Sequence, residues 1–453
     1  MKERFRYIFL ITVDCLRADH VGCIGGTDLT PNIDKLSRDS VVFTKAFANG
    51  PGTNQSFPAI LTSTYFFIHG GLHLNPRCTT LAEVLSKHGF RTVAFHSNPF
   101  LSKMFGWDKG FHEFYDFMNV IKAPSATVTR LQRGKLVNRL TRIALNVLGA
   151  SYSRRIRELL KKIYYRFSRI EKPYLEGTEL NQHVTNWIEK HKNEKFFLWV
   201  HYMDPHEPYI PPKEYLSNFS SREEALKFNL SVDMNNPSEE DLTILRELYK
   251  GEVKYVDSCI AELINNIEDR GLLEDSLIII TADHGHAFME HGKFGHAYDI
   301  LYNEVIHVPL IVYGLGGTHK INKCVQLLDL PPTVLDLLGI NPPSTFIGKS
   351  LIDRLESLPI FSESAEPNLV ELKYNLSKNI ISCIKKEFKL ILSNFTNTME
   401  LYNIRKDPLE KKNISNIEEG IVNELISVID KHFTYEKVYK MKLKLVRSNH
   451  AKD

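Results

Sequence analysis

Short apolar runs recur along this chain, and they predict the buried strands of a largely parallel sheet. The runs are uninterrupted and rich in β-branched and aromatic residues, as expected for strands that helices cover on both faces. They occupy residues 7–11, 41–43, 92–95, 196–200, 277–280 and 308–313. Helical patterns at about 56–64 and 80–85 alternate with them, which favours an α/β fold. Pro309 predicts that the last run is an edge strand or that the strand starts there.

A second, smaller unit is predicted at the C-terminal end of the chain. From about residue 359 there are two short strand patterns at hairpin spacing, residues 380–384 and 388–392, and a helical pattern follows them. The chain has 453 residues, 43% of them hydrophobic, which is enough to bury a large core in one α/β domain. We therefore predict a main domain over residues 1–357 and a small α+β subdomain over residues 358–453.

Charge is distributed unevenly, although the formal net charge is only +3. That net charge is too small to indicate nucleic-acid binding. A basic, amphipathic helical insert is predicted at about residues 121–175, where acidic residues are few. Two interpretations stay open for it: a solvated helical hairpin packed on the core, or an anion-facing lid or patch that contacts a membrane surface. The oligomeric state is left open.

Neither the cysteines nor the first apolar run indicates export. The six cysteines are scattered without metal-type spacing, so free thiols are expected. Asp14 interrupts the first apolar run after fewer residues than a signal-peptide core or a membrane span needs. We therefore expect cytoplasmic residence and no transmembrane helix.

Two carboxylates follow predicted strands that lie far apart in the sequence. Asp14 comes directly after the first strand, and Asp283 follows the strand at 277–280 with His284 next to it. The carboxyl ends of parallel strands meet at one edge of a sheet, where ligands gather in α/β proteins. Because two buried carboxylates need a counter-charge, these residues predict a site for one hard divalent cation. Helix capping is the alternative for Asp14.

A hydroxyl is predicted at the start of a helix. Thr53 and Ser56 lie where backbone N–H groups and the helix dipole favour negative charge, which suits an alkoxide or a bound phosphate or sulfate. Coordination to a metal can lower the pKa of such a hydroxyl far enough to make it a nucleophile. Both residues are also ordinary capping residues, so capping is the alternative.

Other side chains with suitable chemistry follow predicted strands. Arg17 can pair with a carboxylate, a phosphate or a deprotonated nucleophile. Lys293 and His296 can hold a tetrahedral anion or protonate a leaving group, and His206, flanked by prolines, can bind or protonate the leaving-group oxygen. Asp204 can orient His206 or bind a second metal, or it can simply form a turn.

In their order and spacing these clusters resemble the sulfatase-like branch of the alkaline phosphatase superfamily. The resemblance covers most of the chain and rests on residues 14–20, 30–36, 53–62, 204–209 and 283–285, with support from 307–310, 329–336 and 400–403. It implies a three-layer α/β/α sandwich with a mostly parallel central sheet, and a small C-terminal antiparallel sheet. It also implies that Asp14, Asp283 and His284 are metal ligands, together with the nucleophile.

The resemblance places Thr53 where sulfatases have the cysteine that becomes formylglycine, and Ser56 on the serine of their motif. The chain departs from that motif, because Gln55, Phe57 and Ser63 stand where proline, arginine and glycine are usual. Formylglycine cannot form from threonine, so the resemblance does not imply conventional sulfate-ester hydrolysis.

Other departures resemble relatives that act on phosphorus, such as lipoteichoic acid synthases and phosphoglycerol transferases, where threonine is the nucleophile. Cys15 replaces the second aspartate after Asp14, and His284 replaces the asparagine common in sulfatases. The resemblance therefore implies a hydrolase or transferase that acts on a phosphate ester, most simply a phosphodiester.

The expected mechanism is in-line attack by Thr53 Oγ on phosphorus. The cation and Lys293 would stabilise the equatorial oxygens, Arg17 would assist, and His206 or His296 would protonate the departing alcohol. Water or an acceptor hydroxyl would then resolve the phosphothreonine intermediate. Oxygen ligands with one imidazole suit Mn, Mg or Ca, and Zn also fits. A second metal, held by Asp204, His206 and His296, is a lesser alternative.

Two other functions stay open. One is a sulfuric ester hydrolase with an atypical nucleophile, and the other is a non-catalytic homologue that binds an anion or glycan. The near-complete set of metal and anion ligands argues against the second. In each case the expected partner is an anionic ester, either a small molecule or one linked to a glycan or lipid.

Overall fold

An eight-stranded sheet forms the centre of the computed structural model, which describes residues 5–118, 172–316, 319–352, 358–368 and 373–450. In spatial order its strands are β10 (His319–Gln326), β2 (Ser40–Phe47), β9 (His307–Tyr313), β6 (Ser276–Ala282), β1 (Tyr7–Val13), β5 (Phe196–Tyr202), β3 (Arg91–Phe95) and β4 (Glu113–Tyr115). Strand β9 is antiparallel to both of its neighbours, and the other described pairings in this sheet are parallel. The sheet is therefore mostly parallel, as predicted.

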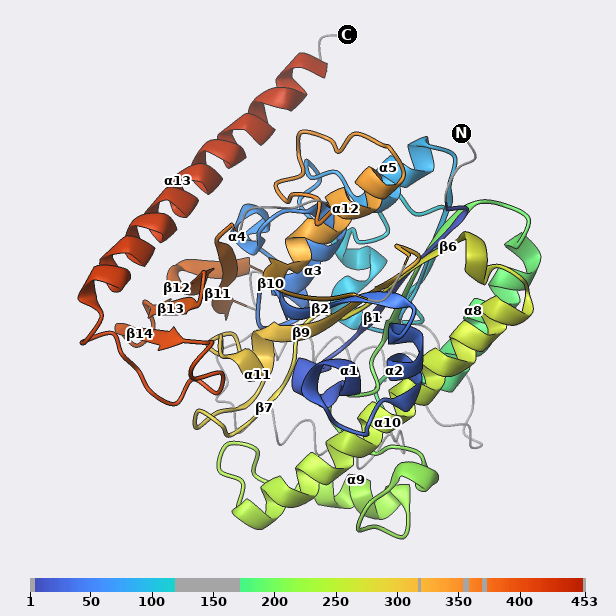
Figure 1. Cartoon of the computed structure of the whole chain (residues 1–453), viewed down its shortest axis with the longest axis horizontal. Coiled ribbons are helices and arrows are strands. Elements are labelled where there is room, and N and C mark those ends of the chain that lie inside the picture. Colours follow the sequence, from blue (N-terminus) through green and yellow to red (C-terminus); the bar gives the residue numbers. More distant parts are fainter. Residues whose placement is uncertain (1–4, 119–171, 317–318, 353–357, 369–372, 451–453) are drawn as a thin grey trace, which may run out of the picture.

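Helices cover the sheet on both faces (Figure 1). On one side the long helix α10 (Glu239–Asp269) packs against α8 (Gly177–His191) and α2 (Pro31–Ser37). On the other side α3 (Thr53–Thr62) packs against α5 (Leu81–Lys87) and α12 (Leu330–Leu337). This arrangement confirms the three-layer α/β/α sandwich.

Shorter elements complete the main domain. They are α1 (Gly22–Gly25), α4 (Phe66–His69), α9 (Arg222–Ser231), α11 (Asn303–Ile306), β7 (Ala287–Phe288), β8 (Phe294–Gly295) and the 3₁₀ helices η1 (Ala18–His20), η2 (Pro99–Leu101), η3 (Lys103–Phe105), η4 (Lys213–Tyr215), η5 (Leu273–Asp275) and η6 (Leu327–Asp329).

The three central strands are buried along their whole length, which explains their uninterrupted apolar sequences. Every residue of β1, β5 and β6 is buried. A strand with helices on both faces has no solvent side, so its sequence does not alternate between apolar and polar residues. The same burial disfavours charged side chains within the strands, so Asp14 and Asp283 come directly after β1 and β6, at one edge of the sheet.

Of the two positions predicted from Pro309, the edge strand was wrong, because β9 is an interior strand between β2 and β6. The position near the start of a strand agrees with the structure, since Pro309 is the third residue of β9. Proline is tolerated there because the pairing with β2 is interrupted beside it. Val308 pairs with Ala46 and Leu310 pairs with Phe43, so β2 has a bulge opposite Pro309. At a bulge the ladder of hydrogen bonds is interrupted, so the N–H that proline lacks is not needed there.

A four-stranded antiparallel sheet forms the C-terminal part, and it contains the predicted hairpin. Its order is β11 (Ile360–Asn368), β12 (Lys373–Lys385), β13 (Phe388–Ser393) and β14 (Thr398–Asn403). The terminal helix α13 (Glu419–His450) runs along one side of this sheet (Figure 1). Apolar side chains of α13, including Leu425 and Ile429, pack with Leu390 and Leu401 of the sheet in one core.

The basic insert predicted at about 121–175 lies outside the described residues, except for its last four positions. Within the described part of the chain, none of the helices is both long enough and apolar enough to cross a bilayer.

Candidate active site

The predicted metal ligands meet at the edge of the sheet where β1 and β6 end. These strands pair in register up to Val13 and Ala282, so the residues that follow, Asp14 and Asp283, are neighbours. Asp14, Asp283 and His284 are all fully buried. One ligand atom from each of the three lies within 4.8 Å of the others. Nε2 of His284 is 3.5 Å from Oδ1 of Asp14 and 3.5 Å from Oδ2 of Asp283.

The electrostatics of this trio favour a bound cation. Burial and the neighbouring Asp14 carboxylate raise the pKa of Asp283 to about 8. Burial acts to raise the pKa of Asp14 as well, but its hydrogen bond with His201 and the nearby imidazoles hold that pKa well below its usual range. Burial lowers the pKa of His284, so its ring is neutral and offers a lone pair. Without a cation, Asp283 therefore carries a proton near neutral pH that a metal ion would replace.

Two atoms of the trio have no hydrogen-bond partner among the described residues, namely Oδ2 of Asp283 and Nε2 of His284. Each is buried and each is a metal-ligating atom. A buried polar atom without a partner costs about 1–3 kcal/mol, which coordination to a cation would remove. The residues present therefore fit a divalent cation. Two carboxylates with one imidazole are compatible with Mn, Mg, Ca or Zn.

The nucleophile predicted from the sequence lies beside this trio. Helix α3 begins at Thr53, three residues before the predicted start, and Gly52 is the residue that caps it. Thr53 is buried, with 8% of its surface exposed, and its side chain forms a hydrogen bond with Asp283. Its hydroxyl thus lies at the positive end of a helix and next to a cation ligand, where an alkoxide would be stabilised.

Asn98 is a site residue that the sequence reasoning missed. It follows β3, and its Nδ2 donates to Oδ2 of Asp14 at 3.1 Å and to Oγ1 of Thr53 at 3.4 Å. It is buried and its Oδ1 accepts from the backbone N–H of Phe100, so Asn98 caps η2. The signal available in the sequence was a polar run after a predicted strand, residues 96–98, at the same edge of the sheet as Asp14.

His201 is a second missed residue, although its segment was noted. It is fully buried at the end of β5, and its Nε2 lies 3.5 Å from Oδ2 of Asp14. Its Nδ1 shares a hydrogen bond of 2.9 Å with Thr12 Oγ1. This contact orients the ring toward the carboxylate.

Gly285 allows the turn that carries the second carboxylate. A Cβ at this position would lie 2.3 Å from the backbone oxygen of Glu304 and 3.2 Å from Cγ of Arg17. Its N–H donates to the oxygen of Val305, and its own carbonyl lies 2.9 Å from Nδ1 of His284. That last contact leaves Nε2 of His284 directed at the carboxylates.

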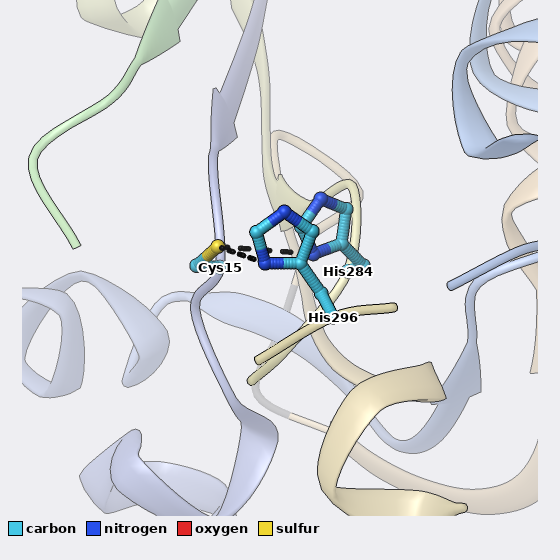
Figure 2. A group of neighbouring side chains, drawn as sticks. All are labelled: Cys15, His284 and His296. Carbon is cyan, nitrogen blue, oxygen red and sulfur yellow. Dashed lines mark hydrogen bonds between the residues drawn. The ribbon is translucent and has the colours of Figure 1, made fainter. Parts of the chain in front are cut away.

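Cys15 lies beside the rings of His284 and His296 (Figure 2). Its Sγ donates to Oδ1 of Asp14 at 3.1 Å, and it lies 3.6 Å from Nδ1 of His296 and 3.9 Å from Nδ1 of His284. The rings of His284 and His296 stack with centroids 4.6 Å apart. Burial, followed by the charge of Asp14, raises the pKa of the Cys15 thiol well above its usual value. Cys15 is therefore a protonated donor to Asp14.

The two histidines predicted to protonate the leaving group lie together at this site. The rings of His206 and His296 are 5.1 Å apart. His206 also belongs to a group with Asp14 and Cys15 whose ligand atoms lie within 4.8 Å of one another. Nδ1 of His206 lies 2.7 Å from the backbone oxygen of Glu207, which fixes the ring.

Both predicted cationic residues are paired with carboxylates. Arg17 donates to Asp19 through Nε and Nη2, at 2.9 and 2.7 Å, and through Nη1 to Glu290 at 2.5 Å. Arg17 was expected to pair with a carboxylate, a phosphate or a deprotonated nucleophile, and in the structure it pairs with carboxylates. Nζ of Lys293 donates to Oδ2 of Asp299 at 2.9 Å. A direct contact of either residue with substrate stays a prediction.

Asp204 does not join the donors that a second metal was expected to use. Its Oδ1 lies 3.5 Å from Nζ of the buried Lys172, which also donates to Glu252 at 2.8 Å. It also accepts from the backbone N–H of Gly177. Among the described residues Asp204 belongs to none of the groups that bring His206 and His296 together. The second-metal set named from the sequence is thus not assembled.

The chain was compared with known families and proteins. It matches the family model described as Sulfatase over residues 6–340, and the model described as N-sulphoglucosamine sulphohydrolase, C-terminal, over residues 289–438. A curated relative, an arylsulfatase of Clostridium perfringens, is 24% identical over 91% of this chain and 90% of its own length.

Solved structures share the fold at low sequence identity. The phosphonate monoester hydrolase of Agrobacterium radiobacter has a TM-score of 0.68 and 20% identity, and the match covers 94% of this chain and 96% of that one. BT4656, solved in complex with its substrate D-glucosamine-2-N,6-O-disulfate, has a TM-score of 0.67 and 18% identity, over 95% of this chain and 98% of that one. The Sulfatase match extends over well over half of the chain. The chain therefore belongs to the sulfatase family, within the alkaline-phosphatase-like superfamily.

Proposed function

We propose that this sulfatase-family hydrolase cleaves a phosphate ester, most simply a phosphodiester, with Thr53 as the nucleophile. The observation that carries the proposal is the position of the Thr53 hydroxyl at the first residue of α3, hydrogen bonded to Asp283 and within reach of Asn98. A threonine cannot supply the formylglycine on which conventional sulfatases rely. Phosphoryl transfer needs only a well-placed hydroxyl, a stabilised charge and a proton donor.

The sulfatase family depends on a divalent metal, and we assign its position here to Asp14, Asp283, His284 and Thr53. When bound, the cation would supply positive charge for the developing oxyanion and lower the pKa of the Thr53 hydroxyl. Asn98 and His201 hold Asp14 in place from the other side.

The residues of the chain account for each bond change. Thr53 Oγ forms a bond to phosphorus, and its proton passes to solvent water, since Asp283 would itself hold the cation. The bond from phosphorus to the departing alcohol breaks, and His206 or His296 gives that oxygen a proton. Water then attacks the phosphothreonine and gives a proton to the imidazole that protonated the alcohol. The bond from phosphorus to Thr53 Oγ breaks, Thr53 regains its proton from solvent, and a diester substrate leaves as a phosphate monoester. An acceptor hydroxyl in place of water would make the same site a transferase.

Similar structures support a phosphorus substrate without deciding it. Two of them are named phosphonate monoester hydrolases, each with a TM-score of 0.68. A phosphonate monoester, like a phosphodiester, is a tetrahedral phosphorus ester with one negative charge. The curated relatives named arylsulfatase favour a sulfate ester, which has the same charge and shape, so sulfate-ester hydrolysis is the second candidate.

The test is turnover of paired aryl substrates by the enzyme reconstituted with Mn²⁺. Phosphodiester, phosphonate monoester, phosphomonoester and sulfate esters of one phenol are compared for the wild type, Thr53→Ser and Thr53→Ala. We expect phosphodiester turnover that Thr53→Ser keeps in part and Thr53→Ala loses by a factor of about 10³ or more, because removal of a nucleophile leaves only binding and electrostatic catalysis.

A control variant and a direct search for the covalent intermediate complete this test. Thr44→Ala removes a threonine hydroxyl that bonds Ile321 and Asn322 away from the site, and it should leave turnover unchanged. Mass spectrometry of acid-quenched enzyme should find the phosphoryl group of the diester, with its remaining ester substituent, bound to Thr53. Sulfate cleavage that survives Thr53→Ala would refute Thr53 as the nucleophile. Mn²⁺ binding without turnover of any of the esters would instead support an anion-binding homologue.

A further inference from the structure

A second buried group of titratable side chains lies away from the active site, between the small sheet and the C-terminal helix. Glu363 is on β11, and His432 and Glu436 are one turn apart on α13. They are almost completely buried, with exposed fractions of 0%, 7% and 3%. The proposed reaction uses none of them. Acidic side chains are rarely buried to this extent unless they are paired or bind a metal.

The three side chains converge on one point. Nε2 of His432 lies 2.5 Å from Oε1 of Glu363, and one ligand atom from each of the three residues lies within 4.8 Å of the others. Oε1 of Glu436 is buried and has no hydrogen-bond partner among the described residues. One carboxylate oxygen in this group is therefore placed to bind a ligand that the polypeptide does not supply.

The surrounding residues fix the geometry of this group. The His432 ring stacks on Phe361, with centroids 3.9 Å apart and planes 13° from parallel, and it meets the edge of Tyr65 at 4.6 Å. The other oxygen of Glu363 accepts from the backbone N–H of Phe67 at 3.0 Å. Ligands held in this way lose little conformational entropy when an ion binds.

The group also has a route to solvent, and a cationic side chain lies near it. A cavity of about 490 Å³ adjoins it and is lined by Glu436, Lys440 and Phe67, among others. Lys440 is the cationic side chain that acts on both carboxylates, and it supplies one positive charge for two buried acids. When both acids are ionised, the one ammonium group leaves one negative charge, which a bound cation would balance.

We propose that Glu363, His432 and Glu436 bind a divalent cation, with zinc the best match, that fastens α13 to β11. One imidazole and two carboxylates can bind Zn²⁺ tetrahedrally, with a water molecule in the remaining position. The ion would replace the contact between His432 and Glu363 with two bonds to the metal. Through Glu363 it would also hold Phe67 in α4, the helix that follows α3.

The test measures zinc in the full-length chain after the active-site cation has been removed. In an Asp14→Asn/Asp283→Asn background, stripped with a chelator and dialysed against buffered Zn²⁺, elemental analysis should find about one zinc per chain. Adding Glu436→Gln should reduce this to near zero, because the amide keeps the shape and loses the charge. X-ray anomalous scattering at the zinc edge should place the ion between β11 and α13.

Glu424→Gln is the matched control, since Glu424 lies on the same helix but is about half exposed and pairs with Lys385. This variant should keep one zinc, and zinc should raise its melting temperature but not that of Glu436→Gln. Circular dichroism checks that both variants fold. If the control binds no zinc, or if Glu436→Gln binds as much zinc as the control, the proposal is wrong and the three side chains share protons instead.

Discussion

Asn98→Ala is expected to lower turnover strongly although Asn98 has no part in the bond changes. The substitution removes the donor that lies 3.1 Å from Asp14 and 3.4 Å from the Thr53 hydroxyl. Both acceptors belong to the group that would bind the cation and attack the substrate. The same substitution removes the side-chain oxygen that accepts from the N–H of Phe100.

The expected loss of kcat follows from the free energy of these hydrogen bonds. A hydrogen bond to a charged group contributes about 1.5–3 kcal/mol. If that contribution orients Asp14 and Thr53 for attack, its loss lowers kcat by about 10- to 150-fold, since about 1.36 kcal/mol corresponds to a factor of ten. The lost cap should lower the free energy of unfolding by about 0.5–2 kcal/mol.

Urea unfolding and steady-state kinetics with the aryl phosphodiester separate these two effects. Asn181→Ala is the matched control, because Asn181 is also fully buried and donates to a carboxylate, that of Glu262, at 2.8 Å. It should lose similar stability and keep kcat when both variants are assayed well below their melting temperatures. Unchanged kcat in Asn98→Ala, or an equal loss of kcat in Asn181→Ala, would refute the reasoning.

Three further results are expected. Gly285→Ala should abolish Mn²⁺ binding measured by calorimetry. The added Cβ would lie 2.3 Å from the backbone oxygen of Glu304 and would displace the turn that carries two cation ligands. Normal Mn²⁺ binding would contradict this expectation. Burial acts to lower the pKa of His291, but the contact with Glu304 raises that pKa overall. The stability that this pair adds should therefore be complete below pH about 6.5, while Glu304 stays ionised. It should be lost as the pH rises through the raised pKa of His291. Urea unfolding of wild type and His291→Gln from pH 5.5 to 9 should therefore converge at the alkaline end. Lys389→Met should cost about 3–5 kcal/mol of unfolding free energy, because Glu410, 2.7 Å away and equally buried, is left without its counter-charge; Lys389→Met/Glu410→Gln should recover part of that loss.

The positions of the metal ligands could be predicted because the sequence shows where buried strands end. Asp14 and Asp283 each follow an apolar run, and parallel strands bring such positions to one edge of a sheet. The pairing of Val13 with Ala282 is the register that this prediction needed. The start of the nucleophile helix was predicted three residues too late, since Thr53 and Ser56 have similar capping preferences and local sequence does not distinguish them.

The parts that the sequence did not predict depend on contacts between distant segments. Asn98 follows a short strand whose polar run resembles an ordinary loop, and only the order of β1, β5 and β3 brings it to Asp14. An edge position was one of two predicted for Pro309 because proline lacks an N–H, but a bulge in the neighbouring strand removes that constraint. The pairing of Arg17 with Glu290 spans 273 positions of the sequence.

The pairing of Arg17 and Lys293 with carboxylates bears on which ester this site prefers. Asp19 and Glu290 compensate the charge of Arg17, and Asp299 compensates that of Lys293. Neither side chain therefore brings a net positive charge to the substrate. A divalent cation balances the two carboxylates of Asp14 and Asp283. These groups then leave no surplus positive charge for the substrate, so a singly charged ester matches the site better than a doubly charged phosphomonoester. A phosphodiester or phosphonate monoester should therefore have the higher kcat/KM at pH 8, and that preference should shrink at lower pH, where the phosphomonoester gains a proton.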